Sequence, residues 1–169
     1  MFTRIAVPFL VMAFSTPALA EGACPIERAN YVSVDDPKFT AGFAIKPPGG
    51  QFVSDLAFYV HSGATSRTFW FLFDAGSARY MTLISTQDVT AKDWRPPDPD
   101  GPKNHPYPSF EMHYLQSDSG LHFRYNAPRY GQAAPAYILL PDLAERMWYA
   151  IEPREGAPVG VFKLSNCAH

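Results

Sequence analysis

The two cysteines of this chain stand near its opposite ends, and their placement constrains the fold more than any other feature. Cys24 and Cys167 are an isolated pair in a chain of 169 residues. In an exported protein, an even and isolated pair is typical of a disulfide, which requires the two α-carbons to lie within roughly 7 Å. The alternative is two free thiols. We therefore expect the disulfide, with the first and last strands as neighbours.

Residues 1–20 have the order of a secretory signal. One cation, Arg4, precedes the apolar run 5–14, and the small residues at 18–20 predict cleavage after Ala20. The run is about half of the length that crosses a bilayer, so we expect no transmembrane span. This pattern predicts a periplasmic protein, with secretion as the alternative. Because 22–24 resembles the end of a lipoprotein box, a lipid anchor is a further alternative.

The remaining residues, 21–169, have the size of a single domain. Seventeen prolines exclude long helices over most of the chain. Short runs with β-type patterns, separated by turn residues, predict strands. We expect nine of them, at 31–34, 39–46, 52–61, 67–74, 79–86, 109–115, 121–125, 136–140 and 159–164.

This pattern predicts an all-β fold, an antiparallel β-sandwich or flattened barrel of eight or nine strands, with one short helix near 142–149. Asp142 is a good N-cap residue for that helix, with Glu145 three positions later. Leu143 and Met147 form a short apolar stripe. The sequence thus predicts one domain of a single architecture.

Two of the strands predict how the sheet is covered. In 52–61, alternation places Phe52 on the same face as Leu56, Phe58 and Val60. The next hairpin is apolar on both faces, so we expect it to be central and covered on both sides. One face carries Phe69, Phe71, Phe73, Tyr80 and Ile84, and the other Trp70, Leu72, Met81 and Leu83. We expect the helix to cover the second face, with a ligand or a second chain as alternatives.

Segment 95–108 is the main candidate for a binding surface. Six of its fourteen residues are proline, a density that favours extended backbone with little entropy to lose on binding. Trp94, His105 and Tyr107 lie in or beside it, and Tyr130 lies in a second loop. Loop aromatics supply rigid contact area, so we predict that these four residues bind a partner. The alternative is that each aromatic fixes its own loop to the sheet.

Three residues on one predicted strand pair are weak candidates for a metal site. Glu111, His113 and His122 fall on the predicted outer face, where two imidazoles would approach one ion. Arg124 on the same face would repel a cation, and the alternative is a solvated polar face. We expect neither a metal nor a cofactor.

The turn at Asp74-Ala75-Gly76-Ser77 follows the apolar residues 71–73. It resembles the catalytic turn of retropepsin-like aspartic proteases, in which Asp-Thr-Gly or Asp-Ser-Gly follows an apolar strand. The resemblance implies that Asp74 activates water against a peptide bond. It covers about seven residues and departs at Ala75, where the family has a hydroxyl. The chain has one such turn, so two copies would have to pair for two carboxylates to share a proton.

Charge and motifs restrict the remaining functions. Removal of residues 1–20 takes away one cation of 14 and none of the 16 anions, which leaves a net charge of 13 − 16 = −3. That balance, without a basic cluster, argues against nucleic acid and against an anionic membrane surface. Ser62 follows His61, with no orienting acid nearby in sequence. We expect a non-catalytic envelope module that binds a protein, peptide or glycan, with a small hydrolase or a lipid or small-molecule carrier as alternatives.

Overall fold

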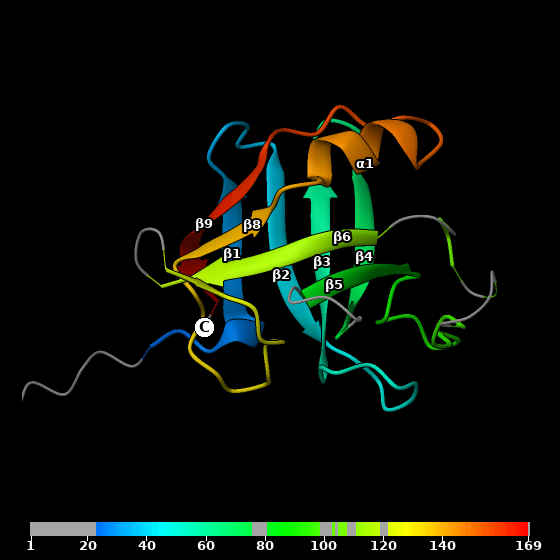
Figure 1. Cartoon of the computed structure of the whole chain (residues 1–169), viewed down its shortest axis with the longest axis horizontal. Coiled ribbons are helices and arrows are strands. Elements are labelled where there is room, and N and C mark those ends of the chain that lie inside the picture. Colours follow the sequence, from blue (N-terminus) through cyan, green and yellow to red (C-terminus); the bar gives the residue numbers. More distant parts are fainter. Residues whose placement is uncertain are drawn as a thin grey trace, which may run out of the picture.

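The fold is known from a computed structural model, which describes residues 23–75, 81–98, 103, 105–107, 111–118 and 122–168. The signal-like segment 1–20 lies outside these residues, as do Gly76 to Tyr80 of the predicted hairpin turn. Figure 1 shows a barrel of strands with one short helix at one end.

Within the described residues, nine strands and two short helices form. The strands are β1 Ala29–Ser33, β2 Phe39–Ile45, β3 Leu56–Ser62, β4 Arg67–Asp74, β5 Met81–Thr86, β6 Glu111–Ser117, β7 Phe123–Arg124, β8 Tyr137–Leu140 and β9 Gly160–Cys167. The helices are the 3-10 turn η1 Ile26–Arg28 and the α-helix α1 Leu143–Tyr149. Each predicted strand overlaps an observed one, and the predicted helix differs by one residue at its start. The all-β prediction is confirmed.

The strands close into an eight-stranded antiparallel barrel. Its order is β1-β2-β3-β4-β5-β6-β8-β9, and β9 pairs again with β1. Pairing of β5 with β6 completes the ring, while the two-residue β7 adds to one edge of β6. Closure removes the exposed edges that an open sheet would carry. Of the two architectures expected, the barrel is therefore the observed one.

The disulfide between Cys24 and Cys167 forms, with the α-carbons 5.7 Å apart. β1 and β9 are antiparallel neighbours, and Ala29 lies opposite Cys167. Both sequence predictions are thus confirmed, since the terminal strands meet and the thiols are bonded. Among the described residues, no helix has the length and apolar character needed to cross a membrane.

The barrel interior is filled with aromatic side chains. β4 alternates so that Phe69, Phe71 and Phe73 point inward, where Phe71 and Phe73 have no solvent exposure. Phe73 packs edge-on against Tyr114 with ring centroids 5.0 Å apart. Leu143 and Met147 of α1 belong to the same cluster and close one end of the barrel (Figure 1). Burial of one such side chain contributes on the order of 2 kcal/mol, and interiors this dense tolerate few voids.

The predicted faces of β5 are wrong. Leu83 lies opposite Phe73, and both Met81 and Leu83 belong to the interior cluster. Ile84 lies opposite Leu72 and so faces outward from the barrel. Side chains alternate between the two faces of a strand. A register error of one residue across the hairpin therefore assigns every side chain of the strand to the wrong face.

The outer face of β4 is covered by a loop and not by the helix, which corrects a second prediction. Val89 and Trp94, which follow β5, pack against Ala57 and Leu72 to form a second, smaller apolar cluster. Phe52 joins this cluster as well, and not the inner face with Leu56. Because β3 begins only at Leu56, alternation does not extend back to Phe52.

Candidate binding groove

A groove of about 370 Å³ lies between β4, the chain that follows β5 and the predicted binding segment. β4 contributes Thr68 and Trp70, the chain after β5 contributes Gln87 and Asp88, and segment 106–107 forms the remaining side. Phe69 and the buried Thr86 complete the lining. We call this feature the wall groove.

Trp70 is placed in the wall groove by strand alternation. Phe69 and Phe71 point into the barrel, so Trp70 between them points outward. Its ring packs against Tyr59 of β3, with centroids 5.2 Å apart, and contacts the second apolar cluster. The indole is therefore fixed on two sides while it stays partly exposed to the groove.

Tyr107 forms the opposite side of the wall groove and contacts Arg67, Ser85 and Phe69. Its hydroxyl accepts a hydrogen bond from Nη2 of Arg67 at 3.1 Å, and its carbonyl accepts one from Ser85 Oγ at 2.9 Å. Its ring packs against Phe69 with centroids 6.2 Å apart. The Arg67 guanidinium also lies over the Phe69 ring, 4.9 Å from its centroid, and 3.7 Å from the Glu155 carboxylate, although Arg67 itself does not line the groove.

Asp88 brings a carboxylate to the wall groove. Its Oδ1 accepts hydrogen bonds from the Thr90 backbone N–H at 2.8 Å and the Thr90 hydroxyl at 2.6 Å, so the side chain is held in a local turn. Oδ2 makes no hydrogen bond with the residues that the structure describes. The groove thus combines three aromatic rings with one negative charge, and no cation among the described residues lines it.

The other predicted binding residues lie elsewhere. Trp94 is only 6% exposed, and its indole N–H donates to Thr86 Oγ1 at 3.0 Å. It thus fixes its own loop to the sheet, which was the alternative for these aromatics. His105 is partly buried, with Nε2 2.7 Å from the carbonyl of Asp98. Tyr130 is 57% exposed but belongs to the loop after β7, outside the wall groove.

The weak metal candidates are not brought together. β6 pairs with β7 at Gln116–Arg124 and Ser117–Phe123, so His122 falls past the end of β6. His113 lies about five residues back along the strand, or about 16 Å. Its Nδ1 is instead 2.7 Å from Asp142 Oδ2. No group of three potential ligands among His, Cys, Asp and Glu gathers within the described residues.

Asp142 lies at its predicted position, but its carboxylate has a different hydrogen-bond partner. It is the residue before α1, as expected, but its side chain makes no cap hydrogen bond to the helix. The carboxylate accepts from both the backbone N–H and the ring of His113. It therefore ties the helix to β6 and does not cap its own N-terminus.

Asp74, the weak catalytic candidate, and the Ser62–His61 pair have different surroundings. Asp74 is the last residue of β4, lies opposite Thr82 and is partly buried, while most of its turn falls outside the described residues. Ser62 does have an acid partner, because its Oγ donates to Glu155 Oε1 at 2.7 Å. His61 faces the other way and contacts Thr68 Oγ1, so it does not bridge Ser62 to that acid. Glu155 was missed because it lies 93 residues away in sequence.

The aromatic side chains that a carrier would need to line an interior cavity are packed against one another. Phe43, Phe58, Phe73 and Tyr114 form a chain of ring contacts with centroids 5.0 to 6.5 Å apart. In the described core these rings therefore pack against one another and not around a ligand.

Comparison with protein-family models, with curated proteins and with solved structures finds no match to this chain. Its function must therefore be argued from its own residues.

Proposed function

We propose that this chain is an exported, non-catalytic binding module of the cell envelope, and that its wall groove binds an extended segment of a protein partner carrying a basic side chain. The observation that carries the proposal is that Trp70, Tyr107 and Asp88 line one groove. Each residue comes from a different part of the chain, so the fold is what brings them together.

The chemistry of these three residues favours a cation. The face of an aromatic ring attracts a positive charge, and a neighbouring carboxylate adds direct electrostatic attraction. Arg67 lies beside the groove and is paired with Glu155, which offsets part of its repulsion. An anionic segment would lose its hydration and meet Asp88, which disfavours it. A lysine or arginine side chain of the partner fits all three groups.

An open groove on a rigid wall also suits an extended chain. Small-molecule sites enclose most of their ligand, whereas peptide sites give pockets for alternate side chains along a surface. Tyr107 and Trp70 are already fixed by Arg67, Phe69 and Tyr59, so little side-chain entropy is lost on binding. These features support recognition by a preformed surface.

The signal-like residues 1–20 and the Cys24–Cys167 bond support an oxidising, extracytoplasmic location, for which the periplasm is our proposal and secretion the alternative. Mass spectrometry of fractionated cells tests this part. We expect a mature chain that starts at Glu21 outside the cytoplasm. An intact, reduced chain in the cytoplasm would contradict it.

Binding of three matched extended peptides tests the groove. They differ only at a central position, which holds lysine, norleucine or glutamate, and their binding is measured by fluorescence polarisation. We expect lysine to bind best, and Asp88→Asn to reduce its advantage over norleucine about fivefold to tenfold, which leaves the smaller attraction of the aromatic rings. Asparagine keeps the Oδ1 acceptor for Thr90, so the local turn is preserved.

Asp36→Asn is the matched control, because Asp36 Oδ1 accepts from the Lys38 N–H in a similar turn away from the groove. It should leave the lysine preference unchanged. The proposal fails if the three peptides bind equally, or if the lysine preference is undiminished in Asp88→Asn.

A further inference from the structure

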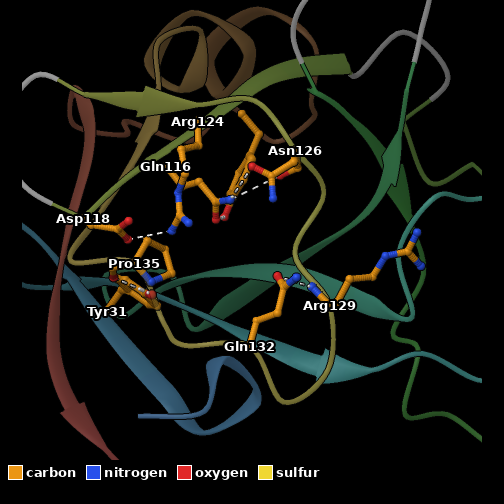
Figure 2. A network of polar contacts seen from close by, with 9 residues as sticks. Tyr31, Gln116, Asp118, Arg124, Asn126, Arg129, Gln132 and Pro135 are labelled. Carbon is orange, nitrogen blue, oxygen red and sulfur yellow. Dashed lines mark hydrogen bonds and ion pairs between the residues drawn. The ribbon is translucent and has the colours of Figure 1, made fainter. Parts of the chain in front are cut away.

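A second pocket, of about 310 Å³, lies at the end of the barrel opposite α1. It is lined by Gln116, Asp118, Arg124, Asn126, Gln132 and Ala133. We call it the barrel-end pocket. Five of these six residues are polar, and three carry side-chain carboxamides. Figure 2 shows Gln116, Asn126, Asp118 and Gln132 around a common space, with the Arg129 side chain pointing away from them.

The floor of the barrel-end pocket is a buried carboxamide. Gln116 continues the inward face of β6 after Met112 and Tyr114, and it is 3% exposed. The Tyr114 hydroxyl donates to Gln116 Oε1 at 3.3 Å, which fixes the orientation of the amide. Gln116 Nε2 then points to Asn126, at 3.3 Å from its carbonyl and 3.4 Å from its Oδ1. All three hydrogen bonds are long, at 3.3 to 3.4 Å.

The charges of the barrel-end pocket balance. Arg124 Nη2 lies 2.6 Å from Asp118 Oδ1. Both charges also act on the buried tyrosines beneath. Burial raises the pKa of Tyr31, and Asp118 raises it further, whereas Arg124 partly offsets the raised pKa of Tyr114. Both hydroxyls therefore stay protonated and serve as donors. The lining offers hydrogen bonds of both kinds without a net charge.

The loop that forms the other side of the barrel-end pocket is fixed through its backbone. The Tyr130 N–H donates to Asp55 Oδ1 and the Gly131 N–H to Glu27 Oε2, each at 3.0 Å. Gly131 has φ +76°, which a residue with a side chain rarely adopts. Gln132 Oε1 accepts from the Arg129 N–H at 3.0 Å.

Further ties join this loop to the N-terminal residues and the barrel. The Gln132 carbonyl accepts from Ile26 N–H at 2.8 Å, and the Ala134 N–H donates to the Cys24 carbonyl at 2.8 Å. Tyr31 donates to the Pro135 carbonyl at 2.9 Å (Figure 2). The polar groups of the pocket are thus held in place before any ligand arrives, which lowers the entropy lost on binding.

From this arrangement we infer that the barrel-end pocket binds a neutral, polyhydroxylated ligand of the size of one sugar residue. A carboxamide both donates and accepts, as does each hydroxyl of a sugar, so the two match without a change of protonation. An anion would face Asp118 and a cation would face Arg124, and each charge is already compensated by the other. The pocket volume lies at the lower end of the range for small-molecule sites.

Nitrogen-15 NMR of the oxidised mature chain tests this inference. The protein is titrated separately with D-glucose, N-acetyl-D-glucosamine, glycine and uracil, while the side-chain amide signals are followed. We expect saturable shifts of the Gln116, Asn126 and Gln132 amides with a sugar only. Asn126→Ala and Gln132→Glu should each weaken that binding about tenfold, since each removes a hydrogen-bond donor. Glutamate keeps the acceptor for the Arg129 N–H.

Gln87→Glu, in the wall groove, is the matched control and should leave sugar binding unchanged. An unaltered methyl spectrum shows that each variant is folded. The inference is overturned if no sugar shifts these amides, or if glycine or uracil binds more tightly. Sugar binding that both pocket variants leave intact would place the ligand elsewhere and would overturn it equally.

Discussion

Two connections of the barrel carry its candidate sites, and they are held by different forces. The connection after β5 is fixed by side chains, since Trp94 is buried in the second apolar cluster and Tyr107 packs on Phe69. The connection after β7 is fixed by its backbone, through carboxylates from Asp55 and Glu27. Where apolar side chains anchor the connection, the site beside it is the aromatic wall groove. Where backbone hydrogen bonds anchor it, the site is the polar barrel-end pocket. The kind of anchor thus determines which chemistry each site can present.

Truncation of Trp94 should have the largest effect and should separate the two regions. Trp94→Ala removes the main side chain of the second cluster and leaves a void, which costs about 3–5 kcal/mol of the free energy of unfolding. Urea denaturation measures this loss. We expect lysine-peptide binding at the wall groove to weaken as well, while sugar binding at the barrel-end pocket persists in the folded fraction.

Unchanged stability in Trp94→Ala would contradict the account of the wall connection. It would restore the first interpretation of Trp94 as a free contact residue. Equal loss at both sites would instead show that the two regions are coupled.

The sequence was sufficient for the features that depend on local pattern. The β-type run at 67–74 between turn residues predicted the bounds of β4, and the paired cysteines predicted the contact between β1 and β9. The burial of Trp94 could not be predicted in this way, because it depends on Ala57 and Leu72 of other strands. An aromatic residue in a loop is not part of a periodic pattern, so its burial cannot be predicted from its neighbours in sequence.

The candidate sites were accessible in part. Segment 95–108 was chosen for its prolines and aromatics, and Tyr107 from it does line the wall groove. Trp70 was missed because it was assigned to a covered face, although an outward aromatic beside a proline-rich segment was a usable signal. No such sequence signal marks Gln116 and Gln132, because isolated carboxamides are common on surfaces and only the fold brings these two together.

A smaller effect is expected at Tyr31, which belongs to the barrel end. Tyr31→Phe removes the hydrogen bond to the Pro135 carbonyl and should cost about 1 kcal/mol at neutral pH. The folded pKa of Tyr31 is raised, so its contribution is complete below the unfolded pKa of about 10 and is lost as pH rises above it.

Urea denaturation at a series of pH values checks this. We expect Tyr31→Phe to lose less stability than the parent chain between neutral and strongly alkaline pH. A steeper loss in the variant would show that the Tyr31 hydroxyl is not a buried, neutral donor.

Amide hydrogen exchange with and without the disulfide tests most directly the claim that the two connections are held differently. Cys24 lies beside the backbone pairs that fix the barrel-end loop, so the double variant Cys24→Ala, Cys167→Ala should loosen that loop first. Under native conditions we expect faster exchange at Ile26 and Ala134, with little change at Trp94, whose N–H bonds the Ala91 carbonyl. Equal acceleration at all three amides, or acceleration at Trp94 alone, would contradict the account.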